Sequence, residues 1–185
     1  MHKKIPKYYY YIDNFDLENI KNIKKDTAVI FRNYKNNTNK DLLIKIRNYL
    51  KIRKIKFILA NDIKLAICLK LDGAYIPSFN KSVKHLNFYI KKDFLFIGSA
   101  HNLKEIRMKE IQRCDAIFIS SIFKKNTNYL GIKRFNLISK LTNKKVIALG
   151  GISKKNLKQI KLTSASGFAG ISYFKKKAPY TNKGL

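Results

Sequence analysis

FLFIGSAHNLKEIRMKEIQR, residues 94–113, is the stretch of sequence that decides the fold. It opens with an apolar run, 94–98, that is too short for a helix and predicts a buried strand. Asn102 and Glu105 then have the spacing of a capping box, so we expect a helix over residues 102–113. Four apolar residues fall roughly on one face of that helix: Leu103, Ile106, Ile111 and Cys114. A buried strand followed by an amphipathic helix is the repeating unit of a parallel β/α fold.

The same unit recurs along the rest of the chain. Seven further apolar runs, each rich in Ile, Val, Phe or Tyr, predict buried strands. They are residues 8–12, 28–32, 56–59, 73–76, 116–120, 146–149 and 167–171. The stretches between them predict helices, over 41–50, 62–69, 134–141 and from Ser153 onward. Eight strands alternating with helices predict a closed α/β barrel, the (β/α)8 or TIM barrel.

The length of the chain constrains this barrel. A (β/α)8 barrel usually has about 200 residues or more, and this chain has 185. We therefore expect short loops and a missing or reduced last helix. Residues 1–174 are predicted to form a single barrel domain, and residues 175–185 a polar tail. An open, doubly wound sheet is the structural alternative.

The chain is strongly basic, with a formal net charge of +29 from 40 Lys and Arg against 11 Asp and Glu. The excess is carried by 34 Lys and only 6 Arg, and the lysines are spread over the whole chain. A nucleic-acid site favours a basic cluster that includes Arg. We therefore expect nucleic-acid binding that is non-specific at most. The positive field still steers small phosphorylated substrates toward the protein.

Two features bear on the cellular setting. No apolar run approaches the roughly 20 residues that a membrane-spanning helix needs. Cys68 and Cys114 are too few and too far apart for a disulfide framework or a CxxC site. We expect a soluble protein of the reducing cytoplasm that has no membrane partner. The sequence leaves its oligomeric state open.

Small residues follow the last two predicted strands, where the active face of a barrel is expected. Gly150 and Gly151 precede the helix that begins at Ser153, and residues 170–172 (Gly-Ile-Ser) follow the eighth strand. Barrels commonly bind phosphate after strands 7 and 8, where glycines let backbone amides approach the anion. The sequence predicts such a site here. The alternative is that the glycines only permit tight turns.

Three polar side chains follow other predicted strands. Arg32 ends the second apolar run, so we expect it to point from the barrel mouth, where Arg suits a diphosphate. His101 follows the fifth strand, with Ser99 and Asp62 as its expected neighbours. It is either a general acid and base or a structural histidine. Asp62 either caps the helix that follows it or binds a metal.

These strand ends, taken together, resemble the thiamine-phosphate synthase and thiazole tautomerase family over residues 9–173. Five stretches carry the resemblance in the family's order. They are 60–76 (AND…LDGAYI), 97–102 (IGSAHN), 114–123 (CDAIFISSIF), 146–152 (VIALGGI) and 166–172 (SGFAGIS). The resemblance implies a barrel that couples an aminopyrimidine methyl diphosphate to a thiazole phosphate. Mg²⁺, an arginine and lysines would help the diphosphate to leave.

The resemblance also assigns roles to residues of this chain. Arg32 would hold the diphosphate, with His101 and Lys125 as further catalytic residues. Asp62 would be a ligand of Mg²⁺, which we expect to bind weakly without substrate. The residues that would bind the substrates are Lys35, Asn61, Ser99, Thr127, Gly150, Gly151, Ile171 and Ser172.

Three positions depart from the family's pattern. Lys35 is displaced by one residue, Asn80 stands where a second metal carboxylate is expected, and Asn128 replaces a lysine of the diphosphate loop. A synthase-type transferase is the favoured interpretation, because two lysines remain in that loop. One alternative is a thiazole phosphate tautomerase that uses His101 as acid and base. Another is a non-catalytic binder of phosphorylated thiamine precursors or, through its charge, of nucleic acid.

Overall fold

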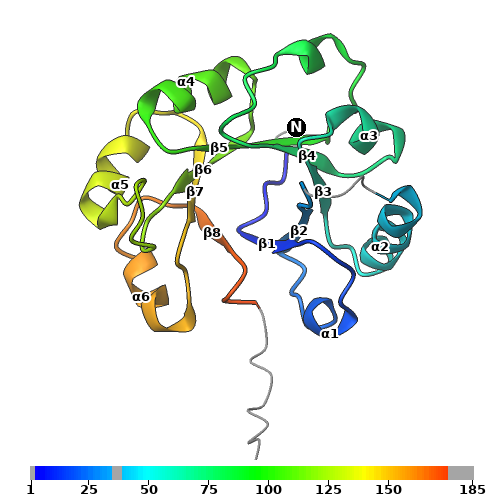
Figure 1. Ribbon diagram of the computed structural model, residues 1–185, viewed down its shortest axis with the longest axis horizontal. Coiled ribbons are helices and arrows are strands. Elements are labelled where there is room, and N and C mark those ends of the chain that lie inside the picture. Colours follow the sequence, from blue (N-terminus) through cyan, green and yellow to red (C-terminus); the bar gives the residue numbers. More distant parts are fainter. Residues whose placement is uncertain (1–2, 35–38, 175–185) are drawn as a thin grey trace, which may run out of the picture.

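Eight parallel strands close into a barrel with the helices on its outside (Figure 1). The computed structural model describes residues 3–34 and 39–174. The strands are β1 Tyr8–Ile12, β2 Thr27–Phe31, β3 Phe57–Ala60, β4 Gly73–Ile76, β5 Leu95–Ala100, β6 Ala116–Ser120, β7 Lys145–Leu149 and β8 Gly167–Gly170. The barrel closes where β1 pairs in parallel with β8, with Tyr8 opposite Phe168. The predicted (β/α)8 barrel is confirmed, and the open sheet is excluded.

The helices lie between the strands as the sequence predicts, with one addition. They are α1 Leu17–Ile20, α2 Lys40–Ile52, α3 Ile63–Cys68, α4 Leu103–Ile111, α5 Gly131–Ser139 and α6 Leu157–Ile160. Two 3₁₀ turns, η1 Lys84–Asn87 and η2 Lys154–Asn156, complete the set in the described ranges. The sequence did not predict α1, because four residues are too few to show helical periodicity.

The connections are short, and the last helix of the barrel is missing from the described chain. Only a 3₁₀ turn stands between β4 and β5. After β8, the residues up to Phe174 form turns rather than a helix. The predicted polar tail, 175–185, lies outside the described residues. Among the helices of residues 3–34 and 39–174, none is long and apolar enough to cross a membrane.

The strands are buried on both faces, which explains their continuous apolar runs. One layer fills the inside of the barrel with alternate side chains, including Tyr9 and Tyr11 of β1. The other layer lies between the strands and the helices and includes Tyr10. Because side chains alternate along a strand, a single run of tyrosines contributes to both layers.

Helix α4 differs from its predicted orientation. Leu103 and Ile111 are 42% and 58% exposed, whereas Ile106 and Lys109 are fully buried. Gly98 on β5 makes this possible, because a Cβ at that position would lie 2.7 Å from Cδ of Lys109. The aliphatic stem of Lys109 therefore takes the place that the sequence pattern gave to Leu103 and Ile111. The predicted apolar face is confirmed for Ile106 and Cys114, which are buried, and was wrong for Leu103 and Ile111.

Candidate functional site

The carboxyl ends of the strands meet at one mouth of the barrel, because the strands are all parallel. Eleven of the predicted site residues lie in or directly after the strand ends at this mouth. They are Arg32, Asn61, Asp62, Ser99, His101, Lys125, Thr127, Gly150, Gly151, Ile171 and Ser172. Lys35 lies outside the described residues. The fold thus brings residues that are far apart in sequence to the same end of the molecule.

Arg32 is held over the opening of the barrel by an aromatic ring. Its guanidinium carbon lies 4.5 Å from the ring centroid of Tyr11, within cation–π range. Burial raises the pKa of Tyr11 well above its ordinary value, so this phenol stays neutral and leaves the charge of Arg32 uncancelled. Arg32 also lines a recess of about 140 Å³ with Ile171 and with the acidic Asp13 and Asp16. Arg32 and Ile171, two predicted ligand residues that are far apart in sequence, therefore line the same recess.

Ser99 lies inside the barrel rather than on its rim. The Tyr75 hydroxyl donates a hydrogen bond of 2.9 Å to the Ser99 Oγ, and both residues are buried. The sequence did not single out Tyr11 or Tyr75 as parts of the site. The only sequence feature that indicates these tyrosines is the alternation of inward and outward side chains along a strand. Both tyrosines occupy inward positions of strands that end at the mouth.

His101 is fixed by the neighbouring strand. Its Nδ1 lies 3.0 Å from both the backbone oxygen and the Oγ of Ser120, at the end of β6. A carbonyl oxygen only accepts, so this contact places the proton of a neutral ring on Nδ1 and leaves Nε2 as the basic atom. The backbone N–H of His101 donates to Glu105 at 2.7 Å. The hydrogen-bond partners of His101 are thus Ser120 and Glu105, and neither of the expected neighbours, Ser99 and Asp62, is among them.

Asp62 caps a helix, as one of its two predicted roles requires. Its Oδ1 accepts a hydrogen bond of 2.9 Å from the backbone N–H of Leu65 at the start of α3. Next to it, the Asn80 Nδ2 donates to the Asn61 Oδ1 at 2.8 Å. The Asn80 Oδ1 accepts from the backbone N–H of Ser82 at 2.9 Å. Asn80 therefore ties the end of β3 to the loop after β4.

The donor set around Asp62 suits a magnesium ion only in part. The described residues contain no group of three or more His, Cys, Asp and Glu side chains that would hold a metal. One carboxylate and the amides of Asn61 and Asn80 stand where a two-carboxylate site is expected. Mg²⁺ is often held by one or two carboxylates together with substrate phosphates. The residues therefore fit an ion that arrives with a diphosphate, and Asp62 is the one that would hold it.

A buried lysine holds the loop that carries Asn80. The Lys109 ammonium donates three hydrogen bonds, to the backbone oxygens of Pro77 (2.8 Å) and Asn80 (2.9 Å) and to the Gln112 Oε1 (2.8 Å). Gln112 in turn donates to the backbone oxygens of Asn80 (2.9 Å) and Ser82 (2.8 Å). Burial lowers the pKa of Lys109 to about 8. Residues 77–82 are thus fixed from inside the protein.

Lys109 and Gln112 were not predicted as parts of the site from the sequence. The available signal was their spacing, because both follow Ile106 at intervals of three residues and so share its helix face. A lysine in that pattern is usually solvated, since lysine is almost never fully buried without partners. Only the carbonyl oxygens of the loop after β4, which lie far away in sequence, make this burial tolerable.

Gly150 and Gly151 pack the loop after β7 against the loop after β6. Both have positive φ angles, of 103° and 73°. A Cβ would lie 2.4 Å from the Ser121 Oγ at Gly150, and 2.6 Å from the Lys124 backbone nitrogen at Gly151. The Gly150 oxygen also accepts from the Phe123 N–H at 2.9 Å. The glycines are therefore needed for backbone conformation and close packing, as the tight-turn alternative holds.

The turn that follows these glycines is closed by a capping box. The Ser153 N–H donates to the Asn156 Oδ1 at 2.9 Å, and the Asn156 Nδ2 donates to the Gly151 oxygen at 2.8 Å. Gly170, at the end of β8, lies beside this turn, since a Cβ there would be 3.9 Å from the Ile152 oxygen. The two stretches predicted to bind phosphate are thus neighbours.

Lys125 and Thr127 are exposed in the loop after β6. Two backbone hydrogen bonds of 2.9 Å close this loop, from Ser121 N–H to the Asn128 oxygen and from Leu130 N–H to the Ser121 oxygen. The loop is therefore ordered at its base, while the side chains that were predicted to contact diphosphate stand in solvent.

The fold and the mouth define a class of protein: a (β/α)8 barrel with a cationic side chain and small-residue turns at the carboxyl ends of its strands. The particular family follows from comparison with known proteins. The family model described as thiamine monophosphate synthase matches residues 18–174. The chain therefore belongs to the thiamine monophosphate synthase family, and the resemblance seen in the sequence is confirmed.

Relatives with assigned names agree with this family. A thiamine-phosphate synthase of Hydrogenobaculum sp. is 28% identical over 153 residues, which cover 79% of this chain and 71% of the relative. A putative thiamine-phosphate synthase 2 of Aquifex aeolicus is 32% identical over 136 residues, with coverages of 70% and 71%. The match to the Methanococcus vannielii thiamine-phosphate synthase spans 64% of that protein, at 27% identity over 66% of this chain. These names support a thiamine-phosphate synthase-like enzyme of thiamine biosynthesis.

Solved structures agree on the fold. A thiamine phosphate pyrophosphorylase from Pyrococcus furiosus superposes with a TM-score of 0.72 at 19% identity, covering 91% of this chain and 86% of that one. A structure titled "Native KDPGal structure" gives a TM-score of 0.69 at 11% identity, covering 96% and 88% of the two chains. Because barrels with different titles superpose almost equally well, the fold alone does not select the reaction.

Proposed function

We propose that this protein is a synthase-type transferase that couples an aminopyrimidine methyl diphosphate to a thiazole phosphate and releases diphosphate. The observation that carries the proposal is the recess at the mouth, which both Arg32 and Ile171 line. Arg32 belongs to the side assigned to the diphosphate, and Ile171 to the side assigned to the thiazole phosphate. The recess itself is small and is also lined by Asp13 and Asp16, so what supports the proposal is that the two assigned sides of the mouth adjoin there.

The coupling breaks the bond between the pyrimidine methylene carbon and the diphosphate oxygen, and the electron pair leaves with the diphosphate. The thiazole nitrogen attacks the methylene carbon and forms the new C–N bond. Positive charge that is already in place favours the departure of an anion, because the protein need not reorganise during the step. Arg32 supplies such charge, since its guanidinium is held over the neutral ring of Tyr11.

Mg²⁺ belongs to the proposal as a partner of the diphosphate. When bound, the ion would neutralise charge on the leaving group. Asp62 is the carboxylate that would hold it, while its Oδ1 also caps α3. Lys125 and Thr127 would bind the diphosphate from the loop after β6, and Gly151 and Ser172 would bind the thiazole phosphate.

A cytoplasmic setting and small-molecule partners complete the proposal. Cys68 is exposed, Cys114 is buried, and both are free, which fits a reducing compartment. The high positive charge favours encounter with phosphorylated substrates. Nucleic acid is expected to bind weakly, without sequence preference, and to dissociate between low and physiological salt.

A tautomerase that acts on thiazole phosphate is the second candidate, and the His101 geometry favours it. Ser120 holds Nδ1, so Nε2 is the atom that accepts and returns a proton. Proton transfer of this kind needs a phosphate-binding turn and one acid–base group. It needs neither Arg32 nor a metal, which separates the two candidates experimentally.

The test is to assay both reactions in wild-type protein and in two variants. With both phosphorylated precursors and Mg²⁺, we expect thiamine phosphate to form. Arg32→Ala is expected to slow its formation about a hundredfold, since loss of one preorganised charge-stabilising donor typically has such an effect. His101→Ala is expected to abolish isomerisation of the thiazole phosphate and only to slow the coupling.

Arg134→Ala is the matched control, because Arg134 is exposed on α5. Circular dichroism verifies that each variant is folded. Absence of thiamine phosphate from folded wild-type protein, together with isomerisation that depends on His101, contradicts the transferase and favours the tautomerase. Absence of both reactions, with retained binding of thiazole phosphate, leaves a non-catalytic binder.

A further inference from the structure

The outer wall of the barrel carries a second hollow, a groove distinct from the recess that Arg32 lines. The groove has a volume of about 780 Å³ and lies over β1 and β8, between α1 and α6. Figure 1 shows the two short helices on either side of these strands. In a (β/α)8 barrel every strand is followed by a helix that covers the sheet. Here the described chain after β8 holds turns up to Phe174, and the groove is what this leaves open.

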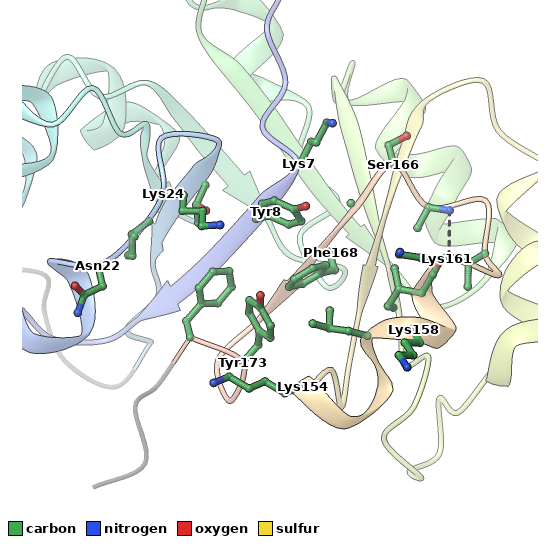
Figure 2. A pocket seen from close by; sticks show the side chains of 18 of the residues that line it. Lys7, Tyr8, Asn22, Lys24, Lys154, Lys158, Lys161, Ser166, Phe168 and Tyr173 are labelled. Carbon is green, nitrogen blue, oxygen red and sulfur yellow. Dashed lines mark hydrogen bonds between the residues drawn. The ribbon is translucent and has the colours of Figure 1, made fainter.

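The floor of the groove is apolar. It is formed by aromatic and aliphatic side chains from both sides: Tyr8, Ile23, Leu157, Ile160, Phe168 and Tyr173. Figure 2 shows Tyr8, Phe168 and Tyr173 among them. Phe168 is the centre, with ring centroids 4.8 Å from Tyr8 and 4.9 Å from Tyr173. These rings meet at angles of 53° and 86°. They therefore pack against one another rather than presenting a row of free faces.

The rim of the groove is basic. Five lysines line it from both sides, and all five are exposed: Lys7, Lys24, Lys154, Lys158 and Lys161. None of the described lining residues is Asp or Glu. The ion pairs found in the described ranges involve Lys3, Lys21 and Arg107 and none of these five. The groove thus combines an apolar floor with five uncompensated positive charges.

We propose that this groove is a docking site for an acidic amphipathic helix of a partner protein. The apolar face of such a helix would cover the half-buried side chains of Tyr8, Leu157 and Tyr173, since Phe168 itself is only 5% exposed. Its carboxylates would meet the lysines on both rims, which adds electrostatic complementarity. The proposal concerns the wall of the barrel and does not rest on the proposed reaction at the mouth.

Charge and ring geometry select this occupant over three others. A second copy of the chain carries a net charge of +29 and would bring like charges to the rim. The chain's own residues 175–185 contain four lysines and no acidic residue, so they repeat the sign of the rim. Single-stranded nucleic acid needs aromatic faces on which bases stack. In the groove Phe168 is only 5% exposed, and Tyr8 and Tyr173 pack against it at 53° and 86°, so no row of parallel ring faces is presented to the bases.

The experiment uses the full chain and a synthetic probe. The probe is a fluorescein-labelled peptide of about 16 residues, with Leu and Phe at helical spacing and Glu on the opposite face. A peptide of the same composition in scrambled order is the reference. We expect 1:1 binding of the amphipathic peptide by fluorescence anisotropy at physiological salt. The scrambled peptide is expected to bind about tenfold more weakly, because it cannot cover the floor.

Two double variants test the site. Lys158→Glu with Lys161→Glu reverses two rim charges, and we expect it to weaken binding at least tenfold. Lys104→Glu with Lys133→Glu makes the same change in net charge on α4 and α5, where both lysines are exposed, and is expected to change affinity less than twofold. NMR shifts of groove amides on peptide addition locate the site, and thermal melting verifies that both variants are folded.

Four outcomes overturn the proposal. Equal affinity for the two peptides, or equal losses in the two variants, shows attraction by charge alone. No binding at millimolar peptide shows that the groove does not accept such a helix. Self-association in light scattering that the rim variant abolishes identifies a second copy as the occupant. Tighter binding of an oligothymidylate than of the peptide, with the same dependence on Lys158 and Lys161, identifies nucleic acid.

Discussion

The mouth of the barrel has two halves that are held in different ways. The first half consists of the ends of β2, β3 and β4, with Arg32, Asp62 and residues 77–82. Its geometry depends on side chains: Lys109 and Gln112 bind the loop from inside, and Asn80 binds Asn61 across it. The second half consists of the turns after β6, β7 and β8. There the geometry is fixed by backbone contacts, because glycines pack directly against the neighbouring loop.

Two of the departures from the family's pattern lie in the described residues, one in each half. Asn80 belongs to the first half, where its side chain is hydrogen-bonded to Asn61 and to Ser82. Asn128 belongs to the second half, where it is exposed in the loop after β6. Gly150 and Gly151 keep the family's sequence, because a Cβ there would overlap Ser121 and Lys124. The positions held by close backbone contact are therefore the ones that do not accept a larger side chain.

The largest effect is expected from Gly151→Val. The new side chain would have to adopt a φ near +73° and would overlap the backbone nitrogen of Lys124. Both costs add, so we expect a loss of about 3 kcal/mol or more in the free energy of unfolding, measured by urea denaturation.

Gly170→Ala is the control for that variant. The nearest atom to a Cβ there is 3.9 Å away, so we expect a change of about 1 kcal/mol or less. Should Gly151→Val prove as stable as Gly170→Ala, the second half is not held by close backbone contact, and the comparison breaks.

A smaller effect is expected from Lys109→Met. The substitution keeps an unbranched chain over Gly98 but removes three hydrogen bonds to Pro77, Asn80 and Gln112. The two backbone oxygens keep other donors, so we expect a loss of about 2 kcal/mol in the free energy of unfolding. In the coupling assay, the KM for the diphosphate substrate should rise while the KM for thiazole phosphate stays near its wild-type value.

Lys104→Met is the matched control, since Lys104 is exposed on the same helix. It is expected to change stability by less than about 0.5 kcal/mol. Equal rises in both KM values for Lys109→Met would show that the two halves are not separable.

Lys109 shows which contacts could be predicted from the sequence and which could not. All eight strands were predicted within about two residues, because a strand buried on both faces is a short apolar run wherever it occurs. Asn102 and Asp62 were predicted as caps, because capping depends on residues three positions apart. Ile106 was predicted on the inward face of α4, but the burial of Lys109 beside it was not, because the partners of Lys109 come from the loop after β4. Sequence patterns thus predict contacts between residues that are close in sequence, and not contacts between distant segments.

The candidate site shows the same limit. Strand ends placed Arg32, His101, Gly151 and Ser172 at one mouth, since parallel strands all end on the same side. The side-chain contacts between neighbouring strand ends could not be predicted from the sequence. That His101 contacts Ser120 depends on how β5 and β6 are aligned, and the spacing of residues within one segment does not report that alignment. The roles of these residues in binding and catalysis stay predictions until the assays are done.

The buried Lys109 of the first half should also make the stability of the protein depend on pH. The pKa of Lys109 is about 8 in the folded protein and 10.5 ordinarily. Between these values the unfolded chain binds more protons than the folded one, so this lysine makes the protein more stable as the pH rises from 8 to 10.5. Below pH 8 its contribution is constant. The difference in free energy of unfolding between wild-type protein and Lys109→Met should therefore grow from pH 8 to pH 10. A constant difference over that range would mean that Lys109 is not buried as a cation.

The smallest expected effect is a gain, from Asn80→Asp. The first half of the mouth has one carboxylate, Asp62, where the family's pattern has two. The new carboxylate cannot donate to Asn61, but the Asn61 amide can turn over and donate in its place, so we expect the protein to stay folded. A second carboxylate near Asp62 should strengthen Mg²⁺ binding and raise the coupling rate at low Mg²⁺ several-fold, or about 1 kcal/mol.

Titration of the coupling rate against Mg²⁺ measures this gain, with calorimetry of metal binding beside it. Asn143→Asp is the matched control, because Asn143 is exposed in the loop before β7, at the opposite end of the barrel, and gives the same change in net charge. A gain in both variants would be a general effect of charge. If Asn80→Asp changes neither metal binding nor coupling while the protein stays folded, the metal-assisted transferase fails. The reaction then belongs to His101 at the end of β5, or the protein catalyses none and only binds.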